Sequence, residues 1–284
     1  MFAELILLSM LHFKDTMQLY TIDAGRFKLD GGAMFGVVPK TLWSKQIQPD
    51  DNNLCSWMMR CLLIEDGNRL ILIDTGMGHK QDPRWQGFYY RHGDGELVKS
   101  IQAHGFSPTD VTDVILSHLH FDHAGGAVQW NSTRDRLELT FPHARYWSHS
   151  AHWDWASQPN AREKATFLKE NIMPIQESGQ LYFVDKEPTL FDNIEIRSLD
   201  GHTEKMLLCI INNSSQKIAF MADLVPSHIH LPIAWVMSYD LRPLVAMEEK
   251  QSFLQEALNN QYVLFFDHDP QYDCCRLEQT ERGI

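Results

Sequence analysis

The sequence lacks the cysteine patterns that are typical of a zinc–thiolate site or of a disulfide framework. The chain of 284 residues has no C-x-x-C pair among its five cysteines, which are Cys55, Cys61, Cys209, Cys274 and Cys275. The missing pairs argue against a zinc–thiolate knuckle, and the odd count in a long chain argues against a disulfide framework. We therefore expect free thiols and a cytoplasmic location.

Basic runs and long apolar runs are also missing. The 25 Lys and Arg residues stand against 37 Asp and Glu residues, a net charge of −12. Without a basic face we expect no nucleic-acid partner. The apolar residues 5–11 are far short of the roughly 20 residues that span a membrane, and they follow Glu4 instead of a basic segment. We expect no membrane contact, a non-essential extension over residues 1–16 and a single domain over residues 17–284.

Strand and helix patterns alternate along the whole domain. Alternating and continuous apolar runs predict strands at 18–22, 57–64, 69–73, 111–116, 145–147, 194–198, 205–211, 218–221 and 262–266. Amphipathic patterns predict helices at 94–104, 148–155, 161–171 and 244–258, and residues 30–36 form a glycine-rich turn. The hairpin over 57–73 argues against a purely parallel sheet. The mixture predicts an α/β (α+β) fold of layered sheets and helices.

One run of ten residues carries most of the chemistry. His118, His120, Asp122 and His123 directly follow the apolar strand at 111–116. Three imidazoles and a carboxylate are costly to bury without partners, and a metal ion offers a partner to all four. Side chains at i and i+2 of an extended chain point the same way. His118 and His120 can therefore hold one ion, and a following turn would carry Asp122 and His123 towards a second.

Three later polar residues follow apolar strands in the same manner. His202 comes after the strand at 194–198, Asp223 after the strand at 218–221 and His268 after the strand at 262–266. Each alone would be an ordinary residue. Together they predict a site at one edge of the sheets.

These motifs, in this order along the chain, resemble those of the metallo-β-lactamase superfamily from about Met17 onward. They are Asp74-Thr75-Gly76, the H-x-H-x-D-H run, Gly201-His202-Thr203, Ala222-Asp223 and His268-Asp269. The resemblance implies a four-layer αβ/βα sandwich with two divalent metal ions, zinc first and iron or manganese as alternatives. It implies one ion on His118, His120 and His202, the other on Asp122, His123 and His268, with Asp223 bridging and Asp74 orienting the ligands.

The implied chemistry is hydrolysis. Two ions that share a water lower its pKa, so that a bridging hydroxide can attack a carbonyl or phosphoryl centre. Asp223 would hold the ions together, and Asp122 could also pass a proton to the leaving group. The run 118–126, the run 141–147 and the segment Gly32–Gly36 resemble the branch of N-acyl homoserine lactonases and methyl-parathion-hydrolase-like enzymes. We expect a lactonase, and a small-molecule substrate with an apolar portion.

The substrate contacts are less defined than the metal ligands. The resemblance suggests Met34, Phe35 and Trp43 as the apolar lining of the substrate pocket. Lactonases of that branch usually carry a tyrosine shortly after the bridging aspartate, and residues 224–231 contain none. His228 is the candidate for substrate contact in that stretch. We interpret His143, His149 and His152 as packing or surface residues.

Five other functions compete with the lactonase. Two are hydrolases of the same superfamily, a phosphotriesterase and an aryl-ester or thiol-ester hydrolase. A third is a one-iron sulfur dioxygenase, which the seven-residue ligand set disfavours. The fourth is a catalytically silent sensory or binding module, which would more often have lost a ligand. An RNA-processing nuclease is disfavoured by the acidic charge, and a homodimer is compatible with the sequence.

Overall fold

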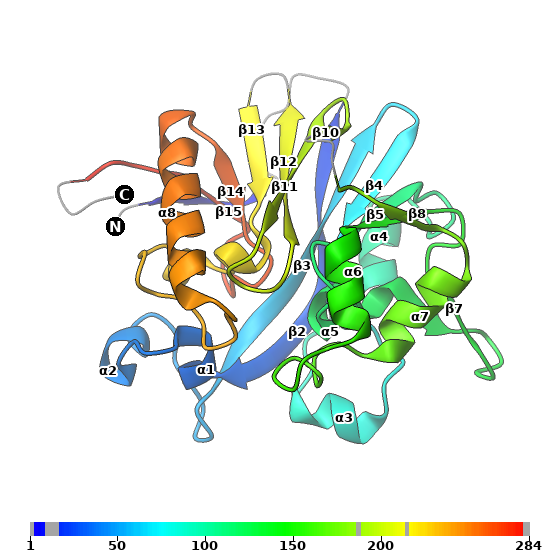
Figure 1. Ribbon diagram of the computed structural model, residues 1–284, viewed down its shortest axis with the longest axis horizontal. Coiled ribbons are helices and arrows are strands. Elements are labelled where there is room, and N and C mark those ends of the chain that lie inside the picture. Colours follow the sequence, from blue (N-terminus) through cyan, green and yellow to red (C-terminus); the bar gives the residue numbers. More distant parts are fainter. Residues whose placement is uncertain (1–2, 9–16, 186–188, 214–215, 281–284) are drawn as a thin grey trace.

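The computed structural model describes residues 3–8, 17–185, 189–213 and 216–280. Two β-sheets face each other at the centre of this part of the chain, and helices cover their outer sides (Figure 1). The predicted four-layer αβ/βα sandwich is confirmed. Among the described residues, no helix combines the length and the apolar character that crossing a membrane requires.

The first sheet begins with a long antiparallel meander and continues with parallel strands. Its order among the described residues is β2 (Gln18–Asp30), β3 (Leu54–Asp66), β4 (Arg69–Ile73), β5 (Asp113–Ile115), β8 (Arg145–Ser148) and β9 (Leu181–Phe183). The predicted hairpin is the antiparallel pair β3–β4, and β4, β5, β8 and β9 run parallel. The mixture of directions agrees with the prediction that the sheet is not purely parallel.

The second sheet is largely antiparallel. Its described strands lie in the order β1 (Ala3–Ile6), β15 (Cys274–Leu277), β14 (Val263–Phe265), β13 (Gln216–Phe220), β12 (Met206–Asn213), β11 (Ile194–Leu199) and β10 (Thr189–Phe191). Strands β6 (Val128–Trp130) and β7 (Leu137–Leu139) form a separate small ribbon.

The first residues of the chain differ from their predicted place outside the domain. Strand β1 pairs antiparallel with β15, and Leu8 is buried. An edge strand has unpaired backbone N–H and C=O groups that can pair with almost any extended segment. The local sequence of residues 3–6 therefore gives no signal for this pairing. Residues 9–16 lie outside the described residues.

The central strands of the first sheet have apolar side chains on both faces, which explains why both faces are covered. In β3 and β4, one set of apolar side chains packs between the two sheets: Leu62, Ile64, Ile71 and Ile73. The alternate set packs under the helices: Leu63, Leu70 and Leu72. Successive side chains of a strand point to opposite faces. An apolar residue at every position therefore requires a sheet buried on both sides.

The α-helices of the described residues are α1 (Gly31–Phe35), α2 (Lys40–Trp43), α3 (Pro83–Phe88), α4 (Leu97–Ala103), α5 (Phe121–Ala124), α6 (Ser150–Ser157), α7 (Lys169–Glu177) and α8 (Pro243–Asn259). Helices α1, α2 and α3 lie at one end of the two sheets, and the longer helices cover the outer faces (Figure 1). Helix α8 covers the second sheet, and its buried positions Ala246, Lys250, Phe253, Leu254 and Ala257 share one face. Helices α4, α6 and α7 lie on the side of the first sheet (Figure 1).

Three predicted segments differ from the structure. The helix predicted at 161–171 is α7, further along the chain, and residues 161–166 form turns that Asn160 stabilises by accepting hydrogen bonds from the backbone of Arg162 and Glu163. The predicted turn at 30–36 contains α1, because the Asp30 side chain accepts a 2.9 Å bond from the Ala33 amide and caps a helical turn. The helix predicted at 94–104 is α4, which begins at Leu97 and ends at Ala103.

Candidate metal centre

Seven predicted ligands come together where strands of both sheets end. His118 and His120 follow β5, and Asp122 and His123 lie in the short helix α5. The other three follow β11, β13 and β14 of the second sheet: His202, Asp223 and His268. Carboxyl ends of neighbouring strands meet at one edge, so loops far apart in sequence deliver their side chains to one place.

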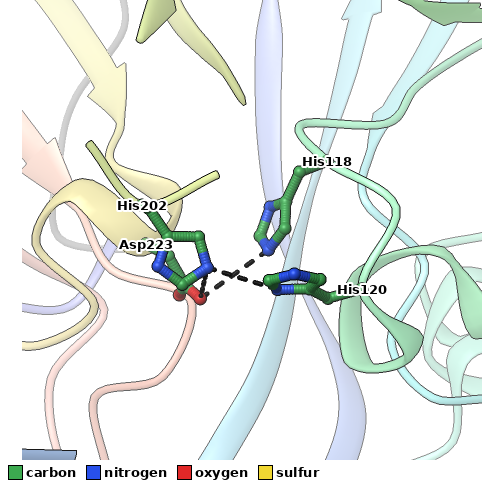
Figure 2. A group of neighbouring side chains, drawn as sticks. All are labelled: His118, His120, His202 and Asp223. Carbon is green, nitrogen blue, oxygen red and sulfur yellow. Dashed lines mark hydrogen bonds and ion pairs between the residues drawn. The ribbon is translucent and has the colours of Figure 1, made fainter. Parts of the chain in front are cut away.

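Figure 2 shows the first group, in which three imidazoles point towards the carboxylate of Asp223. Asp223 Oδ2 lies 3.0 Å from His202 Nε2 and 3.7 Å from His118 Nε2. His202 Nε2 and His120 Nδ1 are 3.2 Å apart. All four residues are at most 8% exposed, and ligand atoms at these separations can surround one ion.

The second group shares Asp223 with the first. Its other members are His123, Asp267 and His268. Asp223 lies 3.7 Å from His123 Nε2 through Oδ2 and 3.3 Å from His268 Nε2 through Oδ1. One carboxylate therefore faces both groups.

Asp122 and Asp267 approach this second group from different directions. Asp122 Oδ2 lies 3.7 Å from His268 Nε2 and 4.0 Å from His123 Nε2. Asp267 Oδ2 lies 3.6 Å from His268 Nε2 but reaches His123 at Nδ1, at 3.8 Å. The Nε2 atoms point into the group, so Asp122 lies on the side where an ion would bind and Asp267 lies behind His123.

Hydrogen bonds hold the histidines of the first group with their lone pairs directed inwards. His120 donates from Nε2 to Glu163 Oε1 at 3.3 Å, and His202 donates from Nδ1 to Asp240 Oδ1 at 2.9 Å. These partners leave His120 Nδ1 and His202 Nε2 as acceptors, and those two atoms face each other at 3.2 Å. Two lone pairs at this distance repel unless a cation lies beside both.

The second group repeats this arrangement. His123 donates from Nδ1 to Asp74 Oδ2 at 2.8 Å, and His268 donates from Nδ1 to the Met58 carbonyl at 2.7 Å. Their Nε2 atoms then face each other as acceptors at 3.2 Å. Asp74 also accepts two 2.7 Å bonds, from the amide and the hydroxyl of Ser117. It thus contacts a histidine of the second group and the residue before His118, a place from which a side chain can orient metal ligands.

Three buried atoms in the cluster have no hydrogen-bond partner in the described part of the chain. They are His118 Nε2, Asp223 Oδ1 and Asp267 Oδ2. A buried polar atom without a partner costs about 1–3 kcal/mol, and divalent cations between the two groups would satisfy the first two. Inward lone pairs, unpartnered atoms and a shared carboxylate all fit a pair of metal ions.

The electrostatics of the cluster also favour cations. Burial lowers the pKa of His202, but the carboxylates of Asp223 and Asp240 outweigh it and raise that pKa to about 10. Burial likewise lowers the pKa of His268, yet Asp267 and Asp223 raise it to about 9. The buried carboxylates thus create a negative potential that, without an ion, would hold a proton on the inward nitrogens of His202 and His268, and a bound metal ion would take the place of that proton.

Strained backbone accompanies the site. Asp74 has φ of 60° and Ala222, which precedes the shared carboxylate, has φ of 42°. Residues with a Cβ rarely adopt the left-handed region, and such positions cluster where a side chain must be aimed at a site. Gly125 is needed for close packing after the ligand helix, since an added Cβ would lie 2.1 Å from the Met77 carbonyl oxygen.

Sequence reasoning missed Glu163, Asp240 and Asp267. Glu163 accepts bonds from His120, from Thr203 at 2.6 Å, and from Trp155 and Asn160 at 2.7 and 2.6 Å. Burial raises the pKa of Glu163, but those hydrogen bonds lower it to about 2, so the carboxylate is charged. Both Glu163 and Asp240 lie in irregular segments that give no local signal. Asp267 stands beside His268 and adjacency alone could have drawn attention to it.

A cavity of about 340 Å³ opens over the cluster. Its wall includes His120, Asp122, His202, Asp223 and His268, and its largely apolar remainder includes Leu29, Met34, Tyr89, Phe121, Met237 and Tyr239. The polar side chains on the wall outside the cluster are Arg162, Glu163, Thr166 and Ser238. The cluster is thus open to a small molecule from one side.

Of the four predicted pocket residues, Met34 alone lines this cavity. Phe35 and Trp43 are fully buried and stack on each other with ring centroids 5.2 Å apart, because α1 and α2 turn them into the core. His228 lies outside the lining and pairs through Nδ1 with the carboxylate of Asp269. These three differ from the prediction, and they support the loops around the cavity instead of lining it.

The three histidines that we interpret as packing or surface residues lie outside the metal cluster. His152 accepts a 2.8 Å bond from the Leu119 amide, and burial lowers its pKa to about 3. It therefore fixes the backbone between His118 and His120. His149 accepts a bond from the Ala151 amide at the start of α6, and His143 is exposed. All five cysteines are buried and free, as expected.

The chain is similar to known proteins. Residues 60–268 match the family described as the metallo-beta-lactamase superfamily. The chain belongs to this superfamily. An N-acyl homoserine lactonase of Bacillus cereus is 29% identical over 167 residues, which make up 55% of this chain and 56% of the lactonase. The chain therefore spans about half the length of the curated relatives it matches.

Two solved structures extend the similarity to almost the full chain. A probable metal-dependent hydrolase of Staphylococcus aureus aligns with a TM-score of 0.87 and 26% identity, over 94% of each chain. AidC, a dizinc quorum-quenching lactonase in complex with a product, aligns with a TM-score of 0.78 and 24% identity, over 96% of this chain and 94% of AidC. The second likeness is one of fold.

Proposed function

We propose that this protein is a metal-dependent hydrolase that binds two divalent ions and opens a lactone such as an N-acyl homoserine lactone. The observation that carries the proposal is the pair of histidine groups that share Asp223, with imidazole lone pairs facing each other at 3.2 Å in each group. His118, His120 and His202 would hold one ion. Asp122, His123 and His268 would hold the other, with Asp223 between them.

The chain and the ions divide the chemistry between them. Divalent ions bound there would lower the pKa of a bound water and polarise the carbonyl of the substrate. The chain aims the ligands through Asp74, Glu163 and Asp240 and keeps the cluster buried. Asp122, which lines the cavity, is placed to pass a proton to the leaving oxygen when the ester bond breaks.

The cavity wall favours a substrate with an apolar portion. Leu29, Met34, Phe121 and Met237 line one continuous space with the metal cluster. An acyl chain buried against these side chains would gain roughly 0.8 kcal/mol per CH₂ group. A lactone substrate is supported by the name of the Bacillus cereus relative, which is an N-acyl homoserine lactonase.

Zinc is the ion we propose, because imidazole and carboxylate ligands suit it. Iron and manganese remain the alternatives to be measured by elemental analysis. The cytoplasmic location and the homodimer stay predictions, to be checked by fractionation and light scattering.

A substrate panel tests the proposal. Metal-loaded protein is assayed with acyl homoserine lactones of increasing chain length, aryl esters, thiol esters and phosphotriesters. We expect lactone opening to be fastest and to improve with chain length, and Asp223→Ala to abolish it. Turnover of esters or phosphotriesters with no lactone opening would assign the site to another reaction, and no turnover at all would favour a silent binding module.

A further inference from the structure

Donor groups in the cavity wall differ in whether they are already engaged. The Arg162 guanidinium donates to the Ser238 carbonyl, and the Thr166 hydroxyl donates to the Glu163 carbonyl at 2.8 Å. The phenol hydroxyls of Tyr89 and Tyr239 also border the cavity. Neither phenol makes a hydrogen bond to another described residue. These two hydroxyls are therefore free to donate to a bound molecule.

The two phenols lie differently relative to the metal cluster. The Tyr89 ring packs on the apolar wall, with its centroid 4.3 Å from Phe121 and 4.8 Å from Trp85. Burial and then Asp122 raise the pKa of Tyr89 to about 12. Burial and then Asp122 also raise the pKa of Tyr239, and Asp223 contributes further. The negative charge of the cluster thus acts on both phenols.

The segment that carries Tyr239 is fixed to helix α1 and to the cluster. The Ser238 amide donates to the Ala33 carbonyl at 2.8 Å, and the Met237 amide donates to Asp240 Oδ2 at 2.9 Å. Asp240 Oδ1 in turn accepts the 2.9 Å bond from His202. One aspartate thus ties the Tyr239 loop to a cluster histidine. The phenol is held in place before a substrate arrives, which is the condition for effective stabilisation of developing charge.

We propose that Tyr239 is a catalytic residue whose hydroxyl donates a hydrogen bond to the carbonyl oxygen of a lactone or ester held over the metal cluster. The bond strengthens as negative charge develops on that oxygen during attack at the carbonyl carbon. The hydroxyl keeps its proton throughout, so no bond at the tyrosine forms or breaks. This inference rests on the proposed function, because it requires a carbonyl substrate in this cavity.

The test compares three phenylalanine variants of the zinc-loaded protein with the wild type. Tyr239→Phe removes the proposed donor. Tyr89→Phe removes the other free phenol of the cavity. Tyr182→Phe is the matched control, because Tyr182 lies in the edge strand β9 and outside the cavity lining. The measurements are kcat and KM for an acyl homoserine lactone, bound zinc per chain, and the melting temperature.

We expect Tyr239→Phe to lower kcat by about 100-fold, the cost of losing one oxyanion donor. KM, bound zinc and melting temperature should change little, and Tyr182→Phe should match the wild type. Tyr89→Phe should affect KM more than kcat.

Three results would overturn the assignment. They are an unchanged kcat in Tyr239→Phe, a loss of kcat that follows a loss of zinc or of folding, and a larger loss of kcat in Tyr89→Phe. A wild type that hydrolyses no lactone or ester would instead refute the proposed function.

Discussion

Glu163 offers a sharp test of how the metal ligands are oriented, through the substitution Glu163→Gln. Oε1 accepts hydrogen bonds from His120 and Thr203, and Oε2 accepts them from Trp155 and Asn160. An amide replaces one acceptor oxygen by an NH₂ group. Placed at Oε2, this group would face two N–H donors. We therefore expect it at Oε1, where the Thr203 hydroxyl can rotate and accept.

In that orientation the NH₂ group faces His120 Nε2. The imidazole must then either lose its partner or move its proton to Nδ1, the atom that faces the first group. Loss of such an orienting partner typically costs 10- to 100-fold in metal affinity, which corresponds to about 1.4–2.7 kcal/mol. Glu163 is 4% exposed, so solvent does little to screen this loss.

The assay is a zinc titration against a chromogenic chelator, which yields two dissociation constants. We expect Glu163→Gln to weaken one of them by 10- to 100-fold and to leave the other within about twofold. Glu177→Gln is the matched control, because it removes the same charge from an exposed position in α7. Two unchanged constants, or an equal loss in both, would show that Glu163 does not orient a ligand of one ion.

Three further predictions concern the surroundings of the site. Asp74→Asn should weaken the zinc dissociation constant that Glu163→Gln leaves unchanged, because Asp74 holds His123 of the second group. The effects of the two substitutions should add in the double variant. A titration in which both variants weaken the same constant would contradict the assignment of the two residues to separate ions. Lys250→Met should lower the free energy of unfolding by about 2 kcal/mol or more, because the ammonium donates to three loop carbonyls at 2.9–3.0 Å; an unchanged urea midpoint would refute this. The five buried thiols should react with a disulfide reagent only on unfolding, and rapid labelling of native protein would show that this part of the core opens.

The sequence predicted the parts of the site that follow regular strands. His118, His202, Asp223 and His268 each come within a few residues of the end of an apolar strand, and strand ends in a layered sheet converge. Strands β3 and β4 were also readable, because both of their faces are buried and most of their residues are apolar.

The parts that sequence could not predict depend on contacts between distant segments. Glu163 and Asp240 lie in irregular loops, and nothing in their neighbours indicates that they hold His120 and His202. The prediction that Phe35 lines the pocket was wrong for a related reason. An apolar residue in a short helix can face the core or the cavity, and the packing of α1 decides which.

The pocket tyrosine illustrates the same limit. The stretch after Asp223 contains no tyrosine, and Tyr239 reaches the cavity from a later loop. Its position follows from the hydrogen bonds of its loop neighbours to Ala33 and His202. Tertiary contacts of this kind have no signature in local sequence.

We propose that two bound ions make this cluster a lactone hydrolase. The decisive measurement is the rate of acyl homoserine lactone opening as zinc is added back to metal-stripped protein. We expect no activity without metal and a rate that reaches its plateau at two zinc ions per chain. Activity in stripped protein, a plateau at one ion, or full loading without turnover would contradict it.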